Sequence, residues 1–275
     1  MNFTYEQLVL RNDGYVHPNL QKHIKSTKLL IAGCGIGSTI AEAAVRLGFN
    51  QFILADGDTV ELHNLNRQAF AMADVGTPKV HALALRLKAI NPQCAVEEQN
   101  VWVTKDNVDD LVKRSDLIFD TIDFLDLATI TYLHDAAHRQ KKPIISAVSV
   151  GWGAAGIYFP PSEGESCGFR KLFGLPAKGD VANASYVQHF GVFLQRVSEH
   201  LDETVNKAMA KAILSLQDGI MCPAPQVSAG SYGVASLAMT MAARILDGKP
   251  TTQSPELILV NTNGVCTSKG IDLTP

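Results

Sequence analysis

The stretch Leu29-Leu-Ile-Ala-Gly-Cys-Gly-Ile-Gly-Ser-Thr-Ile-Ala-Glu-Ala-Ala44 decides the fold, because a short apolar run meets a glycine cluster there. An alanine-rich segment with a helical pattern follows at once, so the stretch predicts a strand, a tight turn and a helix. Glycines at such a turn let the backbone approach a phosphate at the helix N-terminus. Asp56 closes the next apolar run, where a ribose hydroxyl would be bound. The pattern favours a nucleotide-binding domain over a turn with a purely structural role.

The composition is that of a globular protein with no strong electrostatic bias. Of the 275 residues, 46% are hydrophobic and 19% are charged. The formal net charge of −3 gives no sign of DNA binding, although it leaves open a local patch for tRNA. The N-terminus lacks the pattern of a signal peptide, and the apolar segment 233–246 is too short to span a membrane. We therefore expect a soluble, cytoplasmic protein with no membrane partner.

The cysteine pattern argues against a disulfide framework and against a zinc site. The five cysteines are scattered, odd in number and never form a CxxC pair: Cys34, Cys94, Cys167, Cys222 and Cys266. A compact zinc site needs paired ligands at short spacing. We therefore predict no zinc, and we expect each cysteine to behave as a small buried hydrophobe unless its surroundings activate it.

Strands and helices alternate regularly from Lys28 to Val150. The predicted strands are 28–32, 51–56, 95–103, 116–120 and 143–150, and the predicted helices are 37–48, 77–90, 105–113 and 125–138. This alternation predicts a parallel sheet with right-handed crossovers, in which ligands gather at the carboxyl ends of the strands. The polar interior of 95–103 places that strand at an edge or in an exposed position.

The pattern changes on both sides of this region. Helices are expected near 5–10 and 20–24, a strand at 155–159, helical stretches at 186–216 and 233–246, and two final strands at 256–260 and 265–271. We interpret the chain as one α/β domain spanning 1–275, with an N-terminal helical arm (1–27) and a helical insertion (168–220). The fold class is a Rossmann-like, mostly parallel sheet with helices on both faces and antiparallel C-terminal strands.

The segment after the second strand carries polar and cationic side chains that suit a triphosphate. It reads Asp56-Gly-Asp-Thr-Val-Glu-Leu-His-Asn-Leu-Asn-Arg-Gln68, followed by Gly76-Thr-Pro-Lys79. An arginine offers a planar fork for phosphate oxygens, and a lysine offers a compact positive charge. Asp120-Thr-Ile-Asp123 ends the fourth strand, where a carboxylate can hold magnesium that bridges phosphates.

The order of these motifs resembles the ThiF/MoeB/HesA adenylyltransferases, relatives of the ubiquitin-activating enzymes. The resemblance covers about residues 5–160 and resumes weakly at 220–265. It implies a homodimeric enzyme that uses ATP and Mg²⁺ to adenylate a carboxylate, usually the C-terminus of a small carrier protein or peptide. The acyl-adenylate then passes to a sulfur or amine nucleophile.

The resemblance also assigns site residues. It places eight of them around the nucleotide: Gly35 and Gly37 in the turn, Asp56 at the ribose, Asp58 supporting the turn or the metal, Asn64, Arg67 and Lys79 at the phosphates, and Asp123 at the magnesium. Cys222 lies close to where relatives have a catalytic cysteine. A thiol there could form a thioester or persulfide-linked intermediate if its pKa is lowered, and a packing role is the equal alternative.

The chain departs from the family pattern at several positions. Ala32 stands where the family has the first glycine of the turn, Cys34 replaces another glycine, and Phe124 replaces an asparagine. Many members carry an N-terminal arginine that reaches the ATP of the partner subunit. Glu6 or Gln7 occupies that position, so Arg11 is the candidate substitute.

Two other functions stay open at this level. A NAD(P)-dependent oxidoreductase would use the same turn but leaves Arg67 and Lys79 unexplained. A non-catalytic scaffold half of an activating-enzyme complex would account for the irregular glycine turn. The sequence does not identify the carboxylate substrate, and we expect the insertion 168–220 to select the acceptor.

Overall fold

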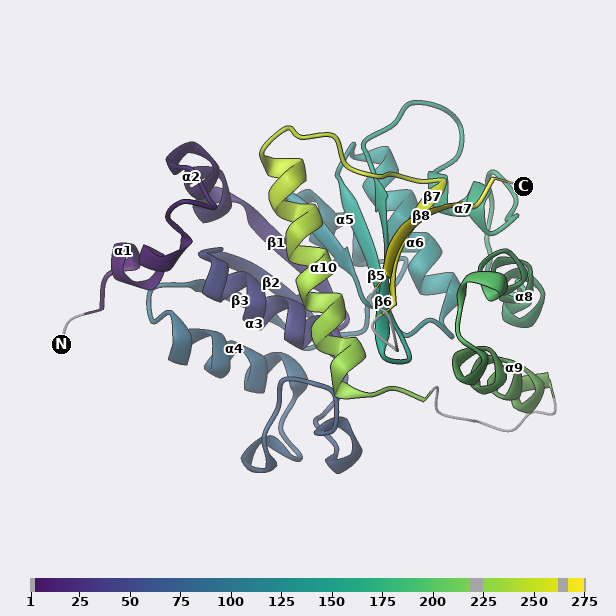
Figure 1. Cartoon of the computed structure of the whole chain (residues 1–275), viewed down its shortest axis with the longest axis horizontal. Coiled ribbons are helices and arrows are strands. Elements are labelled where there is room, and N and C mark those ends of the chain that lie inside the picture. The colour runs from purple at the N-terminus through teal and green to yellow at the C-terminus, as the bar shows by residue number, and fades with distance from the viewer. Residues whose placement is uncertain (1–2, 218–224, 262–266, 275) are drawn as a thin grey trace.

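One eight-stranded sheet runs through the protein (Figure 1). The computed structural model describes residues 3–217, 225–261 and 267–274. In them the strand order is β3-β2-β1-β4-β5-β6-β7-β8, with parallel pairing from β3 to β5 and antiparallel pairing from β5 to β8. The predicted Rossmann-like fold with antiparallel C-terminal strands is confirmed.

The strands lie close to their predicted positions. They are β1 (Lys28–Ala32), β2 (Gln51–Ala55), β3 (Ala95–Gln99), β4 (Leu117–Asp120), β5 (Ile144–Val150), β6 (Gly153–Phe159), β7 (Glu256–Asn261) and β8 (Thr267–Asp272). β3 is an edge strand, as its polar interior predicts. It ends at Gln99 rather than near Val103, because its partner β2 ends at Ala55 and offers no further backbone groups to pair with.

The helices are α1 (Tyr5–Leu8), α2 (Pro18–Ser26), α3 (Gly37–Leu47), α4 (Lys79–Ile90), α5 (Val108–Lys113), α6 (Leu127–Arg139), α7 (Gly168–Leu172), α8 (Tyr186–Val197), α9 (Glu203–Gln217) and α10 (Ser228–Leu246). The predicted helical stretch 186–216 is broken after α8, where Asp202 accepts a hydrogen bond from the Val205 N–H and starts α9. α10 begins at Ser228, five residues before the predicted helical stretch 233–246. None of the helices among the described residues is long and apolar enough to cross a bilayer.

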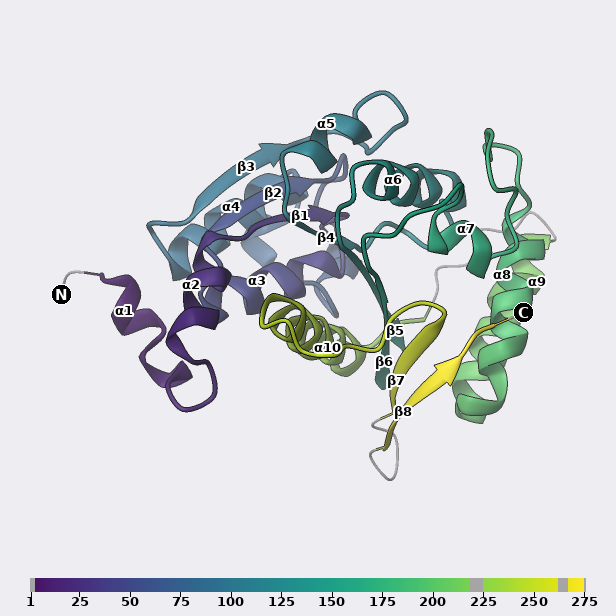
Figure 2. The same ribbon diagram turned by 90° about the horizontal axis from the view of Figure 1, so that it is seen from above.

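Helices cover both faces of the sheet, and each face has its own core (Figure 2). Side chains alternate along β1, so Leu29 and Ile31 pack with α2, α3, α4 and α10, while Leu30 and Ala32 pack with α5 and α6. The helices α7 to α9 lie at the end of the sheet away from α1 and α2 (Figures 1 and 2).

The carboxyl ends of three central strands meet at one edge of the sheet. Ala32 at the end of β1 is in register with Ala55 of β2 and Asp120 of β4. The loops that begin at Gly33, at Asp56 and at Thr121 therefore start side by side. The loop 56–78, which contains the short 3₁₀ helices η2 (Leu62–Asn64) and η3 (Met72–Asp74), projects from this edge at the bottom of Figure 1.

Candidate active site

The turn after β1 needs glycine because the loop after β4 lies directly against it. Gly33 has a φ of +92°, and a Cβ atom there would lie 2.4 Å from the carbonyl oxygen of Thr121. At Gly37, a Cβ would lie 2.5 Å from the Thr121 Oγ1 atom, which itself donates a hydrogen bond to the Gly33 carbonyl. At Gly35, the nearest side-chain atom would be 3.4 Å away. Gly33, rather than Gly35, is thus the glycine that this turn requires for its backbone conformation.

Asp56 ties the glycine turn to the following loop. Its side chain is buried, one oxygen accepts a hydrogen bond from the Cys34 N–H at 2.6 Å, and the other accepts from the Asp58 N–H at 2.8 Å. Each carboxylate oxygen has a second lone pair, so the group can still accept from a ribose hydroxyl. Burial raises the pKa of the Cys34 thiol well above its ordinary value, with the Asp56 charge adding to the effect. Cys34 is therefore a packing residue of the turn.

Lys79 is a buried cation at the start of α4. Only 7% of the residue is exposed, and Nζ pairs with Oδ2 of Asp58 at 2.7 Å. The Lys79 N–H also donates to the Asp58 carbonyl oxygen at 2.9 Å, so the two residues are joined through backbone and side chain. Asp58 itself is half-buried, with 46% of its side chain accessible. The Asp58 carboxylate thus holds the Lys79 ammonium group beside the strand ends, where that group can also donate a hydrogen bond to a phosphate oxygen.

Arg67 and Asn64 come from the loop 56–78, and they differ in availability. Asn64 is buried, and its Oδ1 accepts a hydrogen bond from the Glu61 N–H at 3.0 Å, which fixes the start of η2. Arg67 Nη1 donates to the His63 carbonyl at 2.9 Å, while its buried Nε atom has no partner among the described residues. Burial lowers the pKa of Arg67, and the negative charge of Asp123 opposes this shift. The guanidinium thus retains donors for an anion near Asp123.

The two acidic residues after β4 have different roles. Asp120 is buried, and its Oδ2 accepts hydrogen bonds from Ser146 Oγ at 2.8 Å and from the His134 ring at 3.0 Å. Asp123 is exposed, and its Oδ1 accepts from the Leu125 N–H at 3.0 Å. The carboxylate that can reach a ligand is therefore that of Asp123. His134, which joins Asp120 and Ser146, carries no motif that would have revealed it in the sequence.

The donor set at Asp123 fits magnesium that arrives with a nucleotide. Among the described residues, no group of three or more His, Cys, Asp or Glu side chains could hold a metal ion. Protein-bound Mg²⁺ is commonly held by one or two carboxylates, with substrate phosphates and water completing the octahedron. The exposed Asp123 carboxylate beside the strand ends meets that requirement. A magnesium ion without a nucleotide would find too few protein ligands there.

An exposed tryptophan lies beside the proposed ribose carboxylate. Trp102 follows the edge strand β3 and is 61% exposed. Its indole ring packs on the backbone of Gly57, where an added Cβ would lie 2.7 Å from the ring. The sequence pattern did not single out this residue, although an aromatic residue directly after an edge strand is a usable signal. Its flat ring is available for stacking next to Asp56.

Two predicted site residues are not brought to this edge by the described structure. Arg11 is an exposed residue of the 3₁₀ helix Leu10–Asn12, and the neighbouring Asn12 bonds to the Leu47 carbonyl at the end of α3 away from the glycine turn. A contact of Arg11 with a partner subunit's nucleotide stays a prediction. Cys222 lies outside the described residues. The backbone that follows it returns to the site, because the Gln226 carbonyl accepts a hydrogen bond from Asn66.

Comparisons with known proteins show the family of this chain. A family model described as "ThiF family" matches residues 9–266. The chain belongs to the ThiF family. Among curated ThiF relatives, the heterocyst protein HesA of Trichormus variabilis is 34% identical over 150 residues, 54% of each chain. The sulfur carrier protein adenylyltransferase of Thermus thermophilus is 28% identical over 225 residues, 80% of this chain and 78% of the relative. The match thus spans about half the length of HesA.

Solved structures share the ThiF-type fold. PaaA superposes with a TM-score of 0.69 at 19% sequence identity, covering 98% of this chain and 82% of PaaA. Escherichia coli MccB, in a structure with ATP, superposes with a TM-score of 0.66 at 20% identity, covering 100% of this chain and 73% of MccB. At this identity the likeness shows the fold alone.

Proposed function

We propose that this protein is an ATP- and Mg²⁺-dependent adenylyltransferase that activates the C-terminal carboxylate of a small carrier protein or peptide. The observation that carries the proposal is the gathering of Asp56, Lys79, Arg67 and Asp123 around the glycine turn at one sheet edge. Membership of the ThiF family supports it, as do relatives named as adenylyltransferases of sulfur carrier proteins and of molybdopterin synthase. Homodimerisation and a single domain with an insertion at 168–220 are part of the same proposal.

The nucleotide would lie along the carboxyl ends of β1, β2 and β4. The Asp56 carboxylate would accept from the ribose, and the Trp102 ring would stack on the base. The α-phosphate would approach the backbone N–H groups at the N-terminal end of α3, where the helix dipole favours an anion. This order puts the outer phosphates toward Arg67 and Lys79.

The acceptor carboxylate oxygen forms a bond to the α-phosphorus, and the bond between that phosphorus and the bridging oxygen breaks. The electron pair leaves with pyrophosphate, whose charge Arg67 and Lys79 stabilise. As the leaving group forms, the Lys79 ammonium group, which is paired with Asp58, also donates to the phosphate oxygens. Asp123 would hold the magnesium that accompanies the nucleotide, and the bound ion would supply further neutralising charge. Positioning and charge stabilisation therefore account for catalysis, without a covalent bond to the protein in this step.

The acyl-adenylate formed is an activated acid, and its next reaction is attack by a sulfur or amine nucleophile. Cys222 is the residue of this chain proposed to accept the acyl group as a thioester, with AMP leaving from the acyl-adenylate.

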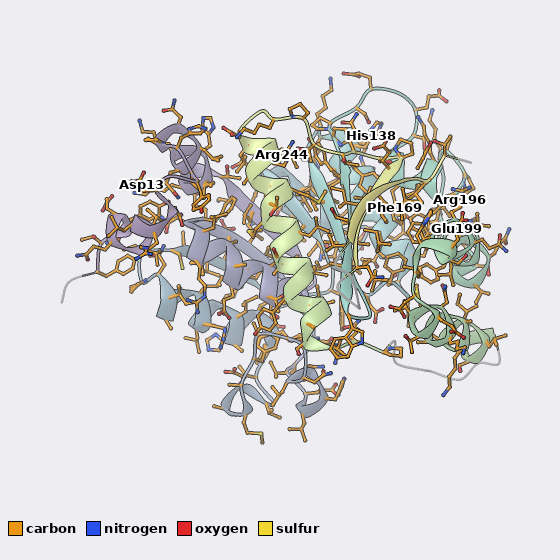
Figure 3. All side chains as sticks on the ribbon, viewed as in Figure 1. Asp13, His138, Phe169, Arg196, Glu199 and Arg244 are labelled. Carbon is orange, nitrogen blue, oxygen red and sulfur yellow. The ribbon has the colours of Figure 1, made fainter. Side chains whose placement is uncertain are left out.

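Exchange of labelled pyrophosphate into ATP tests the proposal. We expect exchange only with Mg²⁺ and an acceptor that has a free C-terminal carboxylate, and none with the same acceptor amidated at its C-terminus. Asp123→Ala should abolish exchange, while Asp13→Ala, an exposed residue at the other end of the molecule (Figure 3), should not change it. Undiminished exchange in Asp123→Ala would overturn the role of Asp123. Binding of NAD(P) without Mg²⁺, in place of ATP, would favour the oxidoreductase.

A further inference from the structure

Phe124, which follows Asp123 directly, packs into the helical insertion. Its ring centroid lies 4.8 Å from that of Phe190 in an edge-to-face arrangement, 6.1 Å from Phe173 and 6.3 Å from Phe193. Phe190 and Phe193 belong to α8, and Phe173 follows α7. Aromatic pairs at these distances contribute beyond the burial of their surface and favour defined ring orientations. The resemblance to the family leads one to expect a polar asparagine at this position, so the packing is a feature of this chain.

The loop that carries Asp123 is fixed at both ends. Thr121 bonds to the carbonyl oxygens of Ala32 and Gly33 at the start, and Asp126 caps α6 through the Thr129 N–H at the end. Between these ends, Phe124 is the side chain whose ring contacts tie the loop to α8. The position of the Asp123 carboxylate therefore depends on where α8 holds Phe124.

The aromatic wall that receives Phe124 is itself rigidly anchored. Phe173 stacks on Phe169 at 4.5 Å and on Phe193 at 5.1 Å. Figure 3 shows Phe169 on the side of the molecule where α8 carries Arg196. Beside Phe169, the buried Arg170 guanidinium donates three hydrogen bonds to the Asp135 carboxylate of α6, at 2.8, 3.1 and 2.7 Å. Displacing α8 would thus move Phe124 rather than simply open a gap around it.

We propose that Phe124 is a positioning residue, through which α8 fixes the Asp123 carboxylate relative to Arg67. The inference rests on the proposed function, because it assumes that Asp123 engages the magnesium bound with ATP. It adds a role for the insertion: α8 helps to set the geometry of the nucleotide site in addition to any contact with the acceptor. An acceptor that shifts α8 would then alter how the nucleotide is held.

The test compares Phe124→Leu and Phe190→Leu with a matched control, Phe159→Leu. Phe159 belongs to the same aromatic core, and its ring centroid lies 4.6 Å from that of His134. Within the described part of the chain, its ring contacts are with His134 and Phe169 and not with Phe124. The readout is calorimetric binding of a non-hydrolysable ATP analogue, with Mg²⁺ and with EDTA, in the full-length protein. Thermal unfolding of each variant reports whether it is folded.

Magnesium should tighten binding of the analogue to the wild type. We expect Phe124→Leu and Phe190→Leu each to reduce this magnesium-dependent gain in affinity about tenfold. Effects of this size are seen when residues that orient a metal ligand are removed. Binding in EDTA should stay within about twofold, and the double variant should lose no more than either single variant, because both act through one contact. Phe159→Leu should keep the wild-type gain.

A magnesium-dependent gain that is unchanged in Phe124→Leu and Phe190→Leu, but lost in Asp123→Ala, would overturn the positioning role and leave the proposed function intact. An equal loss in Phe159→Leu would also overturn it, because the effect would then be a general one of core packing. A wild-type protein that binds no ATP analogue would overturn the proposed function and this inference with it.

Discussion

Replacing Gly33 with alanine tests whether the turn and the loop after β4 are in direct contact. Gly33 has a φ of +92°, and the new methyl carbon would lie 2.4 Å from the Thr121 carbonyl oxygen and 2.7 Å from its carbon. These neighbours are backbone atoms, so they cannot rotate away as a side chain could. The substitution must move the chain at Thr121 and, with it, the loop that ends at Asp123.

Gly14 provides a control that separates the cost of the left-handed backbone conformation from the cost of the contact with Thr121. It has a φ of +88°, almost that of Gly33, but nothing lies within 4 Å of its added Cβ. Gly14→Ala therefore carries only the penalty of a left-handed backbone, about 1–2 kcal/mol. Gly33→Ala carries the same penalty together with overpacking, which typically costs about 1–3 kcal/mol more. The expected loss for Gly33→Ala is thus about 2–5 kcal/mol.

Urea denaturation of both variants measures the difference in their free energies of unfolding. The rate of pyrophosphate exchange reports whether displacement of the loop that carries Asp123 impairs the site. We expect Gly33→Ala to be less stable than Gly14→Ala and to lose most exchange activity under conditions where it is still folded. Gly14→Ala should exchange at the wild-type rate. If the two variants are equally stable and Gly33→Ala retains full exchange, the contact between the turn and the Thr121 loop does not constrain the site.

Three further predictions concern stability and thiol chemistry. Arg170→Met should destabilise the protein by about 3–5 kcal/mol, measured by urea denaturation, because it leaves the Asp135 carboxylate without its bidentate partner; a loss under 1 kcal/mol would contradict this. Burial raises the pKa of Cys167 to about 12, so mass spectrometry after iodoacetamide treatment of the native protein at neutral pH should find this thiol unmodified, and rapid labelling would refute its burial. Burial acts to raise the pKa of Glu42, but hydrogen bonds, first from Arg86, lower it below the ordinary 4.5. The stabilisation that the ionised Glu42 gives the folded state is therefore present at neutral pH and is lost as the pH falls through its folded-state pKa. Glu42→Gln should thus lower the free energy of unfolding at pH 7 and progressively less below pH 4.5. A loss of stability that does not depend on pH would exclude this linkage.

The parts of the fold that depend on local pattern were predictable from sequence. β1, α3 and β2 lie within a residue or two of their predicted bounds, because apolar runs and a glycine cluster specify them locally. The edge position of β3 followed from its polar interior. The break between α8 and α9 was not predicted, because both helices share one apolar pattern and a capping contact of Asp202 divides them.

Some site residues depend on distant contacts that the residue pattern alone does not show. The pattern alone makes Asp120 and Asp123 equivalent, and the family resemblance selects Asp123. Their contacts give the physical reason: Asp120 is enclosed by Ser146 and His134, whereas Asp123 is exposed. The requirement for glycine at position 33 likewise comes from Thr121, far along the chain. The identity of the acceptor depends on surfaces for which a single sequence offers no pattern.

The central claim is that the protein transfers AMP to a carboxylate. It is tested most directly by incubating it with ATP labelled at the γ-phosphate, Mg²⁺ and a panel of carrier proteins and peptides with free C-terminal carboxylates, and separating the labelled products. The account predicts that the label leaves as pyrophosphate, with AMP joined to the acceptor carboxylate in the mass spectrum. Label released as orthophosphate together with ADP would contradict it, because the reaction would then be at the γ-phosphorus and not at the α-phosphorus.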